Sequence, residues 1–313
     1  MNPQLSPAQV SEEELVAFVQ HLRHERQLSE NTVSAYRRDL DQLLSFARAD
    51  EPGCRLSQLT RSQLRQFLSD QAGKVGSSTL ARKMASFRAF YRFCLELGMA
   101  CKDPAQGMRM PKIRRTLPLV LSPESAQELM DSALQSGDPV SLRDQALLEL
   151  LYGSGLRVNE LVGLDMRSID WAAKLLHVVG KGRKERRVPL TDPAITALRR
   201  YLACRDALLK NGAPPSSALF LGVRGARLGA RRVQELVSKC GAISSGRPDL
   251  HPHALRHACA THMLEGGADL RAIQDMLGHQ SVTTTVQYTH LTLLDLSRTY
   301  DRAHPHARQP RTK

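Results

Sequence analysis

A basic segment with three prolines, residues 102–118, is the feature that most limits how this chain can fold. Because proline removes a backbone hydrogen-bond donor and interrupts helices, the segment KDPAQGMRMPKIRRTLP is predicted to be a linker. The sequence therefore predicts two domains, one over residues 1–101 and the other over residues 119–313. The charge of the linker, which includes Arg114 and Arg115, suggests that it runs along a phosphate backbone; an exposed, flexible hinge is the alternative.

The first domain is predicted to consist of four helices within residues 12–100. Leu15, Phe18 and Leu22 have the spacing of one buried helical face, and Ser29 is predicted to cap the start of the second helix. The last of the four helices carries basic residues beside its apolar stripe: Arg82, Lys83, Arg88 and Arg92. Such a row fits contacts to DNA phosphates, and it also fits an ordinary solvated face.

The second domain is predicted to be helical with one small sheet. A helix is expected to start at Ser122, and helical spacing returns after residue 190. Residues 169–190 instead have the pattern of short strands around the polar turn GKGRKE, which indicates an antiparallel hairpin. The expected fold class is therefore mainly α with a small antiparallel β-sheet (α+β).

The charge balance favours a polyanionic partner. The formal net charge is +13, from 44 Lys and Arg against 31 Asp and Glu. Nucleic acid is the first expectation, although membrane surfaces and acidic proteins also attract basic chains. The six cysteines form no C-x-x-C pair, and the sequence shows neither a signal-like start nor an apolar run of membrane-spanning length. A reducing, cytoplasmic location is the simplest interpretation.

Polar and titratable residues gather between residues 251 and 290. His253 and Arg256 are three positions apart, so they share one face of a helix. His279 follows Gly278, where a helical pattern ends, and Tyr288 lies nine residues further on. This ordered set predicts a site with cationic, proton-accepting and nucleophilic groups.

A zinc site on the same helix is an alternative. His253 and His257 are four positions apart, but no glutamate lies between them as in H-E-x-x-H, and no third ligand is evident. No metal is therefore expected, and His257 and His262 are interpreted as structural.

The ordered set resembles the C-terminal signature of the tyrosine recombinases, the phage integrase family: His-x-x-Arg, then Leu-Gly-His, then Tyr. Two further segments resemble that family, GSGLRVNEL around Arg157 and GKGRK around Lys181. From the residues alone, Arg157 could simply pair with Glu160, and Lys181 could be an ordinary turn residue in water. The resemblance implies that Arg157 and Lys181 are catalytic, that Glu160 orients Arg157, and that Lys184 competes with Lys181 for its role.

The resemblance also implies an N-terminal helical core-binding (SAM-like) DNA-binding domain and a C-terminal catalytic domain. Arginine forks would clamp the scissile phosphate, while His253 would accept the proton of the tyrosine nucleophile. Lys181 would protonate the leaving 5′ oxygen, and His279 would donate a hydrogen bond to the phosphate. No cofactor is required. The implied catalytic residues are Arg157, Lys181, His253, Arg256, His279 and Tyr288.

Within that family, the segments ERQLS (25–29), GLRVNELVGLD (155–165) and HPHALRHACATHMLE (251–265) are similar to the Xer recombinases. This likeness implies single-strand cleavage through a 3′-phosphotyrosine, and resolution of chromosome dimers at the dif site during cell division. The implied partners are double-stranded DNA, a XerD-like recombinase in a heterotetrameric synapse and an FtsK-like DNA translocase. A mobile-element integrase, a relaxing topoisomerase and a catalytically silent DNA-binding protein are the alternatives.

A short apolar stripe follows Tyr288. In residues 291–303, Leu293, Leu296 and Tyr300 recur at helical spacing. The resemblance implies that this tail docks into a neighbouring subunit, and folding back onto its own domain is the alternative.

Overall fold

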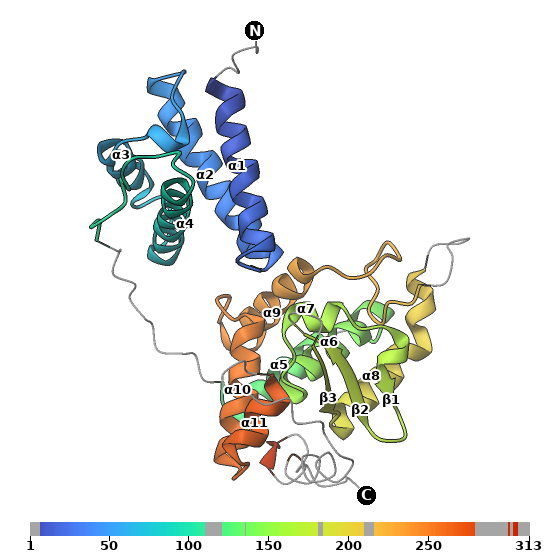
Figure 1. The fold of residues 1–313 in the computed structure, drawn as a ribbon. Coiled ribbons are helices and arrows are strands. Elements are labelled where there is room, and N and C mark those ends of the chain that lie inside the picture. The colour runs from blue at the N-terminus through green and yellow to red at the C-terminus, as the bar shows by residue number, and fades with distance from the viewer. Residues whose placement is uncertain are drawn as a thin grey trace, which may run out of the picture. The chain divides into compact units, whose positions relative to one another are not determined.

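The computed structural model describes residues 7–109, 121–134, 136–180, 184–209, 216–278, 300 and 303–305. The chain divides into two compact units, Met1–Leu117 and Pro118–Lys313. The first unit is helical and the second combines helices with a small sheet, which confirms the predicted fold class (Figure 1). Within the described ranges, no helix has the length and hydrophobicity that a membrane crossing requires.

Over residues 7–109, the N-terminal unit has four α-helices and one 3-10 turn around a mixed aliphatic and aromatic core. Ser29 accepts a hydrogen bond from the backbone of Thr32, which confirms the predicted cap of the second helix. The rings of Phe18 and Phe90 meet edge to face inside the unit, with centroids 5.4 Å apart. Its elements are α1 (Pro7–His24), α2 (Glu30–Asp50), η1 (Leu56–Gln58), α3 (Arg61–Gln71) and α4 (Ser77–Glu96).

The first part of the expected linker belongs to this N-terminal unit. Ala105 is fully buried and Met108 is 8% exposed, both within the N-terminal core. Arg61 donates hydrogen bonds to the backbone carbonyls of Pro104 and Gln106, which ties the turn to α3. The chain therefore leaves the helical core later than its prolines indicated. Residues 110–120, and with them Arg114 and Arg115, lie outside the described part of the chain.

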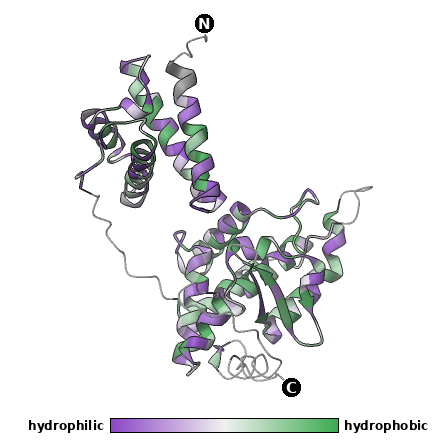
Figure 2. Ribbon diagram, in the orientation of Figure 1, coloured by the Kyte–Doolittle hydropathy of each residue, from purple (hydrophilic) through white to green (hydrophobic). Residues whose placement is uncertain are grey.

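The C-terminal unit is built around α6 (Pro139–Gly153). This helix is apolar on nearly every side because α5, α8 and α10 all pack against it. In Figure 2, hydrophobic and hydrophilic residues alternate around the more exposed helices of the same unit. The other helices of this unit are α5 (Pro123–Ala133), α7 (Val158–Val162), α8 (Asp192–Cys204), α9 (Ala230–Ser245), α10 (Pro252–Glu265) and α11 (Leu270–Leu277), with 3-10 turns η2 (Met166–Ser168) and η4 (Arg205–Leu208).

A three-stranded antiparallel sheet lies in the same unit, in the order β1 (Ile169–Asp170), β2 (Leu175–Val179) and β3 (Glu185–Pro189). Val179 pairs with Glu185, and the backbone N–H of Gly180 donates to the carbonyl of Lys184 at 2.8 Å, which closes the base of the hairpin. The predicted hairpin is thus confirmed. Its tip, residues 181–183, lies outside the described residues.

The end of the tail packs against its own unit in this single chain. Tyr300 is fully buried, and its hydroxyl donates to the backbone carbonyl of Gly153 at the end of α6. Its ring stacks on His304 with centroids 5.0 Å apart. A Cβ built on Gly266 would lie 2.1 Å from the carbonyl oxygen of Ala303, so only glycine permits this approach. For these residues the structure shows the alternative of folding back; residues 279–299 lie outside its described part.

Candidate active site

Arg157 stands at a break between two helices. After α6 the chain turns through Gly155, whose φ of +58° favours glycine, and a Cβ there would lie only 2.6 Å from the side chain of Leu277. Arg157 then precedes the first residue of α7, and its backbone N–H donates to Oε2 of Glu160 at 2.8 Å. The close packing of Gly155 therefore brings Arg157 beside the end of α11.

Glu160 lies between two arginines. Its Oε1 accepts from Nη1 of Arg157 at 2.9 Å and from Nη1 of Arg186 at 2.8 Å, and its Oε2 accepts from Nη2 of Arg186 at 2.8 Å. Burial alone would raise the pKa of Glu160, but hydrogen bonds from Arg186 and Arg157 outweigh it and lower the pKa to about 2. The carboxylate stays ionised at neutral pH and fixes the guanidinium of Arg157, as expected.

Arg256 lies inside the unit on α10. The helix begins with a side-chain cap from His251, followed by Pro252 at its first position. Arg256 is 6% exposed and donates to the backbone carbonyls of Gly155 and Leu277. Burial, helped by the neighbouring Arg157, lowers the pKa of Arg256 to about 10, so the guanidinium remains charged at neutral pH.

His253, one turn before Arg256, lies at the surface of α10. Partial withdrawal from water lowers its pKa below the ordinary value, and the neighbouring charges of His251, Arg256 and Arg157 lower it further. The imidazole is therefore mainly neutral near pH 7 and can accept a proton.

The three arginines meet at the carboxyl end of α11. Arg186 Nε donates to the carbonyl of Met276 at 2.8 Å, Arg256 donates to that of Leu277, and Arg157 Nη2 donates to that of Gly278 at 3.0 Å. These carbonyls lack partners within the helix, and the helix dipole makes its carboxyl end attractive to cations. Gly278 ends the helix with a φ of +68°. The next residue in the chain is His279.

The structure thus brings together three of the six residues predicted to be catalytic, Arg157, His253 and Arg256. The other three, Lys181, His279 and Tyr288, lie outside the described residues. Their described chain neighbours Gly180 and Gly278 both flank the arginine cluster, since a Cβ on either would lie 3.4 to 3.5 Å from Arg186.

Sequence reasoning missed Arg186. The alternation of strand residues could have indicated it, because residues 186 and 188 lie on one face of a strand, and Val188 is buried. A basic residue on the inward face of a strand requires a buried acceptor, and here Glu160 supplies it.

The two histidines interpreted as structural differ. His262 is buried, and its Nδ1 lies 2.9 Å from the hydroxyl of Tyr152. His257 is exposed on α10, so the structural interpretation holds only for His262.

The four residues of the predicted basic row on α4 differ in burial and in their partners. Lys83 is 2% exposed, and its ammonium bonds to Gln42 and lies 3.4 Å from Asp39. The buried Asp39 also accepts from Arg82. Lys83 therefore neutralises a buried carboxylate instead of facing solvent, contrary to the expected exposed row.

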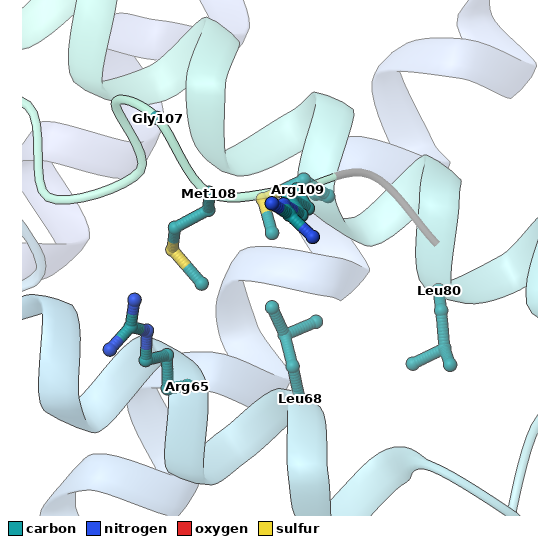
Figure 3. A pocket seen from close by; sticks show the side chains of 7 residues that line it. Arg65, Leu68, Leu80, Gly107, Met108 and Arg109 are labelled. Atoms are coloured by element: carbon teal, nitrogen blue, oxygen red, sulfur yellow. The ribbon is translucent and has the colours of Figure 1, made fainter. Parts of the chain in front are cut away.

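The remaining members of that row stay closer to the surface. Arg88 donates to the backbone carbonyl of Met108, and Arg92 is exposed. Beside them, a pocket of about 440 Å³ opens between α3, α4 and the turn at residues 107–109 (Figure 3). Arg65 and Arg109 line it together with leucine and methionine side chains. Arg109 belongs to the predicted basic linker, whereas the sequence pattern did not single out Arg65.

Comparison with known proteins agrees with this arrangement. Residues 120–293 match the phage integrase family, and residues 15–97 match the phage integrase N-terminal SAM-like domain. The chain is 44% identical over 298 residues to a protein named tyrosine recombinase XerC from Mycobacterium sp. (strain KMS), covering 94% of this chain and 99% of that protein.

Two solved structures share the fold. The XerH site-specific recombinase bound to difH substrate, in a pre-cleavage complex, has a TM-score of 0.64 at 20% identity, over 96% of this chain and 83% of that one. The Tn1549 transposon integrase in complex with circular intermediate DNA has a TM-score of 0.62 at 20% identity, over 90% and 98%.

Proposed function

Because this chain belongs to the phage integrase family, we propose that it is a site-specific tyrosine recombinase that cuts and rejoins DNA. One observation supports this most strongly: Arg157 and Arg256, which are far apart in the sequence, converge on consecutive carbonyls directly before His279. Two fixed guanidinium groups supply the planar donors that recognise a phosphodiester.

The proposed reaction starts with attack of the Tyr288 hydroxyl on the scissile phosphorus. The phosphorus–oxygen bond to the 5′ side breaks, leaving a 3′-phosphotyrosine and a free 5′-hydroxyl. Arg157 and Arg256 stabilise the negative charge that develops on the non-bridging oxygens. His253 accepts the phenolic proton. Tyrosine would otherwise retain that proton at neutral pH, because its ordinary pKa is about 10. Lys181 protonates the leaving oxygen, and His279 donates to the phosphate.

The proposed biological role is that of XerC. The chain would act with a XerD-like recombinase at a dif-like site to resolve chromosome dimers during cell division. An FtsK-like translocase would regulate it, and a role on the chromosome implies the cytoplasm. Identity of 44% across nearly the whole length of a XerC supports this role over that of a mobile-element integrase.

A catalytically silent DNA-binding protein would need basic surfaces but no precise arginine geometry. Glu160 favours catalysis over that alternative, because it holds the guanidinium of Arg157 in one orientation, which a merely basic surface does not require. A test for cleavage of DNA therefore distinguishes a recombinase from a silent DNA-binding protein.

Substitution of the nucleophile tests the proposal. Tyr288→Phe removes the hydroxyl while the ring is retained, so DNA binding should be unchanged and the covalent protein–DNA adduct should disappear. The adduct is measured on denaturing gels with a nicked duplex that carries a dif-like site. Tyr36→Phe, which removes a hydroxyl from the N-terminal unit, is the control and should form the adduct normally. An adduct formed by the Tyr288→Phe protein would contradict the assignment.

A further inference from the structure

Arg186 has no role in the reaction proposed above, yet it bonds to Glu160, the partner of Arg157, and to the end of α11. It projects from β3, and its side chain is 10% exposed. The guanidinium donates to both oxygens of Glu160 and to the carbonyl of Met276, each at 2.8 Å. The planar fork of arginine bonds to both carboxylate oxygens side by side, whereas the ammonium of lysine, although it has three donors, lacks this fork.

Two glycines lie close to this guanidinium, with little more room than a Cβ would fill. A Cβ on Gly180 would lie 3.5 Å from Nη1 of Arg186 and 3.5 Å from Oε1 of Glu160. A Cβ on Gly278 would lie 3.4 Å from Nε and Nη1 of Arg186. Gly180 immediately precedes Lys181, and Gly278 immediately precedes His279. One side chain therefore lies next to the chain directly before two of the proposed catalytic residues.

The sharing of Glu160 has a consequence for Arg157. Each oxygen of Glu160 accepts one hydrogen bond from Arg186, whereas the guanidinium of Arg157 bonds only to Oε1. A single carboxylate thus faces two guanidinium groups, and Arg256 adds a third positive charge nearby. The site keeps a positive excess for a phosphate, while Arg157 is oriented without being neutralised.

We propose that Arg186 is a positioning residue for DNA cleavage: it fixes Glu160, and through it Arg157, and holds the chain ahead of Lys181 and His279. This inference rests on the proposed recombinase function. It predicts that the side chain of Arg186 aligns the β2–β3 hairpin, Arg157 and the end of α11 with one another.

Arg186→Met tests the inference, because methionine keeps much of the side-chain volume and lacks the fork. We expect the single-turnover rate constant of cleavage to fall about 10²-fold, as when catalytic groups are displaced by about 1 Å. The substrate is the nicked dif-like duplex, with the full-length chain and a XerD-like partner. Arg187→Met, a change at the next residue of the same strand, is the matched control; Arg187 is exposed, and its rate constant should stay near wild type.

A second substrate separates Arg186 from the general acid. Replacing the leaving 5′ oxygen by sulfur makes protonation unnecessary, so it should restore cleavage by Lys181→Ala. It should not restore Arg186→Met, because Arg157 and His279 would still be misplaced. The pH profile adds a third readout. Without Arg186, burial should raise the pKa of Glu160, so the variant should lose further activity relative to wild type as the pH falls.

The outcomes distinguish the inference from the proposed function. If the wild-type chain forms no adduct, the recombinase function itself fails. If wild type cleaves and Arg186→Met cleaves at the same rate constant, or sulfur restores it fully, the inference is overturned. A purely structural role would lower the fraction of chain that forms adduct and leave its rate constant unchanged, which also overturns it. If Arg186→Met does not fold, Arg186→Lys retains the charge and should show the same loss of rate.

Discussion

His253 is placed so that its proton-accepting form predominates at neutral pH. Partial withdrawal from water and the neighbouring His251, Arg256 and Arg157 all lower its pKa. A base works in its neutral form, so cleavage should be complete above this lowered pKa and should be lost as pH falls through it. The acid limb of the pH–rate profile should therefore lie below the ordinary histidine value of about 6.5.

The limb can be assigned by substitution. In His253→Gln, the remaining cleavage should be slower and should lack that limb, whereas exposed His257 gives a control, His257→Gln, with an unchanged profile. A limb that persists in His253→Gln would assign it to another group.

Sequence patterns predicted residues at this scale only where a motif fixed both type and spacing. Arg157, His253 and Arg256 were predicted in this way, and the structure brings them together. Lys83 was assigned to an exposed face, because its burial depends on Asp39, which is 44 positions away in the chain. Arg186 was missed for the same reason, since Glu160 becomes its partner only in the folded unit.

At the scale of elements, the described end of the tail acts as part of the catalytic unit. Tyr300 fills a buried site beside α6, stacks on His304 and bonds to Gly153. Tyr300→Ala should therefore destabilise that unit by about 3–5 kcal/mol, as for other large-to-small changes in a core. Tyr300→Phe removes only the hydrogen bond and should cost about 1 kcal/mol. Urea unfolding of the full-length chain measures both.

The same variants distinguish the two arrangements of the tail. If Tyr300→Ala leaves stability unchanged but abolishes cooperative binding to a full site with the partner, the tail docks into a neighbouring subunit, as the family resemblance implied. Binding to a half-site should be equal for the wild-type chain and for Tyr300→Ala, and it serves as the control.

Local signals explain why most elements were predicted and the packing of the tail was not. Ser29 and Ser122 cap helices through bonds to residues three positions on, so their signal lies within one turn of sequence. The hairpin likewise depends on neighbouring strands and a glycine-containing turn. The hydrogen bond from Tyr300 to Gly153 spans 147 positions, and no local pattern encodes it.

For the whole molecule, the net charge of +13 should make DNA binding depend steeply on salt. Each phosphate that the protein binds releases counterions from DNA, so affinity falls as salt rises. The segment containing Arg114 and Arg115 is expected to follow the phosphate backbone. The double change Arg114→Ala and Arg115→Ala should therefore reduce the slope of log affinity against log salt by about one unit for each phosphate that the variant no longer binds.

A control of equal charge separates direct phosphate binding from general attraction. Arg23 and Lys74 are surface cations that already pair with Glu30 and Asp70, at 2.9 and 2.6 Å. The double change Arg23→Ala and Lys74→Ala also removes two positive charges from the molecule. If only the distant field of the protein matters, both double variants should shift affinity alike and keep the slope. If Arg114 and Arg115 touch phosphates, only their removal should make the slope shallower, because only bound cations displace counterions. Titration of a fluorescent dif-like duplex at several salt concentrations decides between these outcomes.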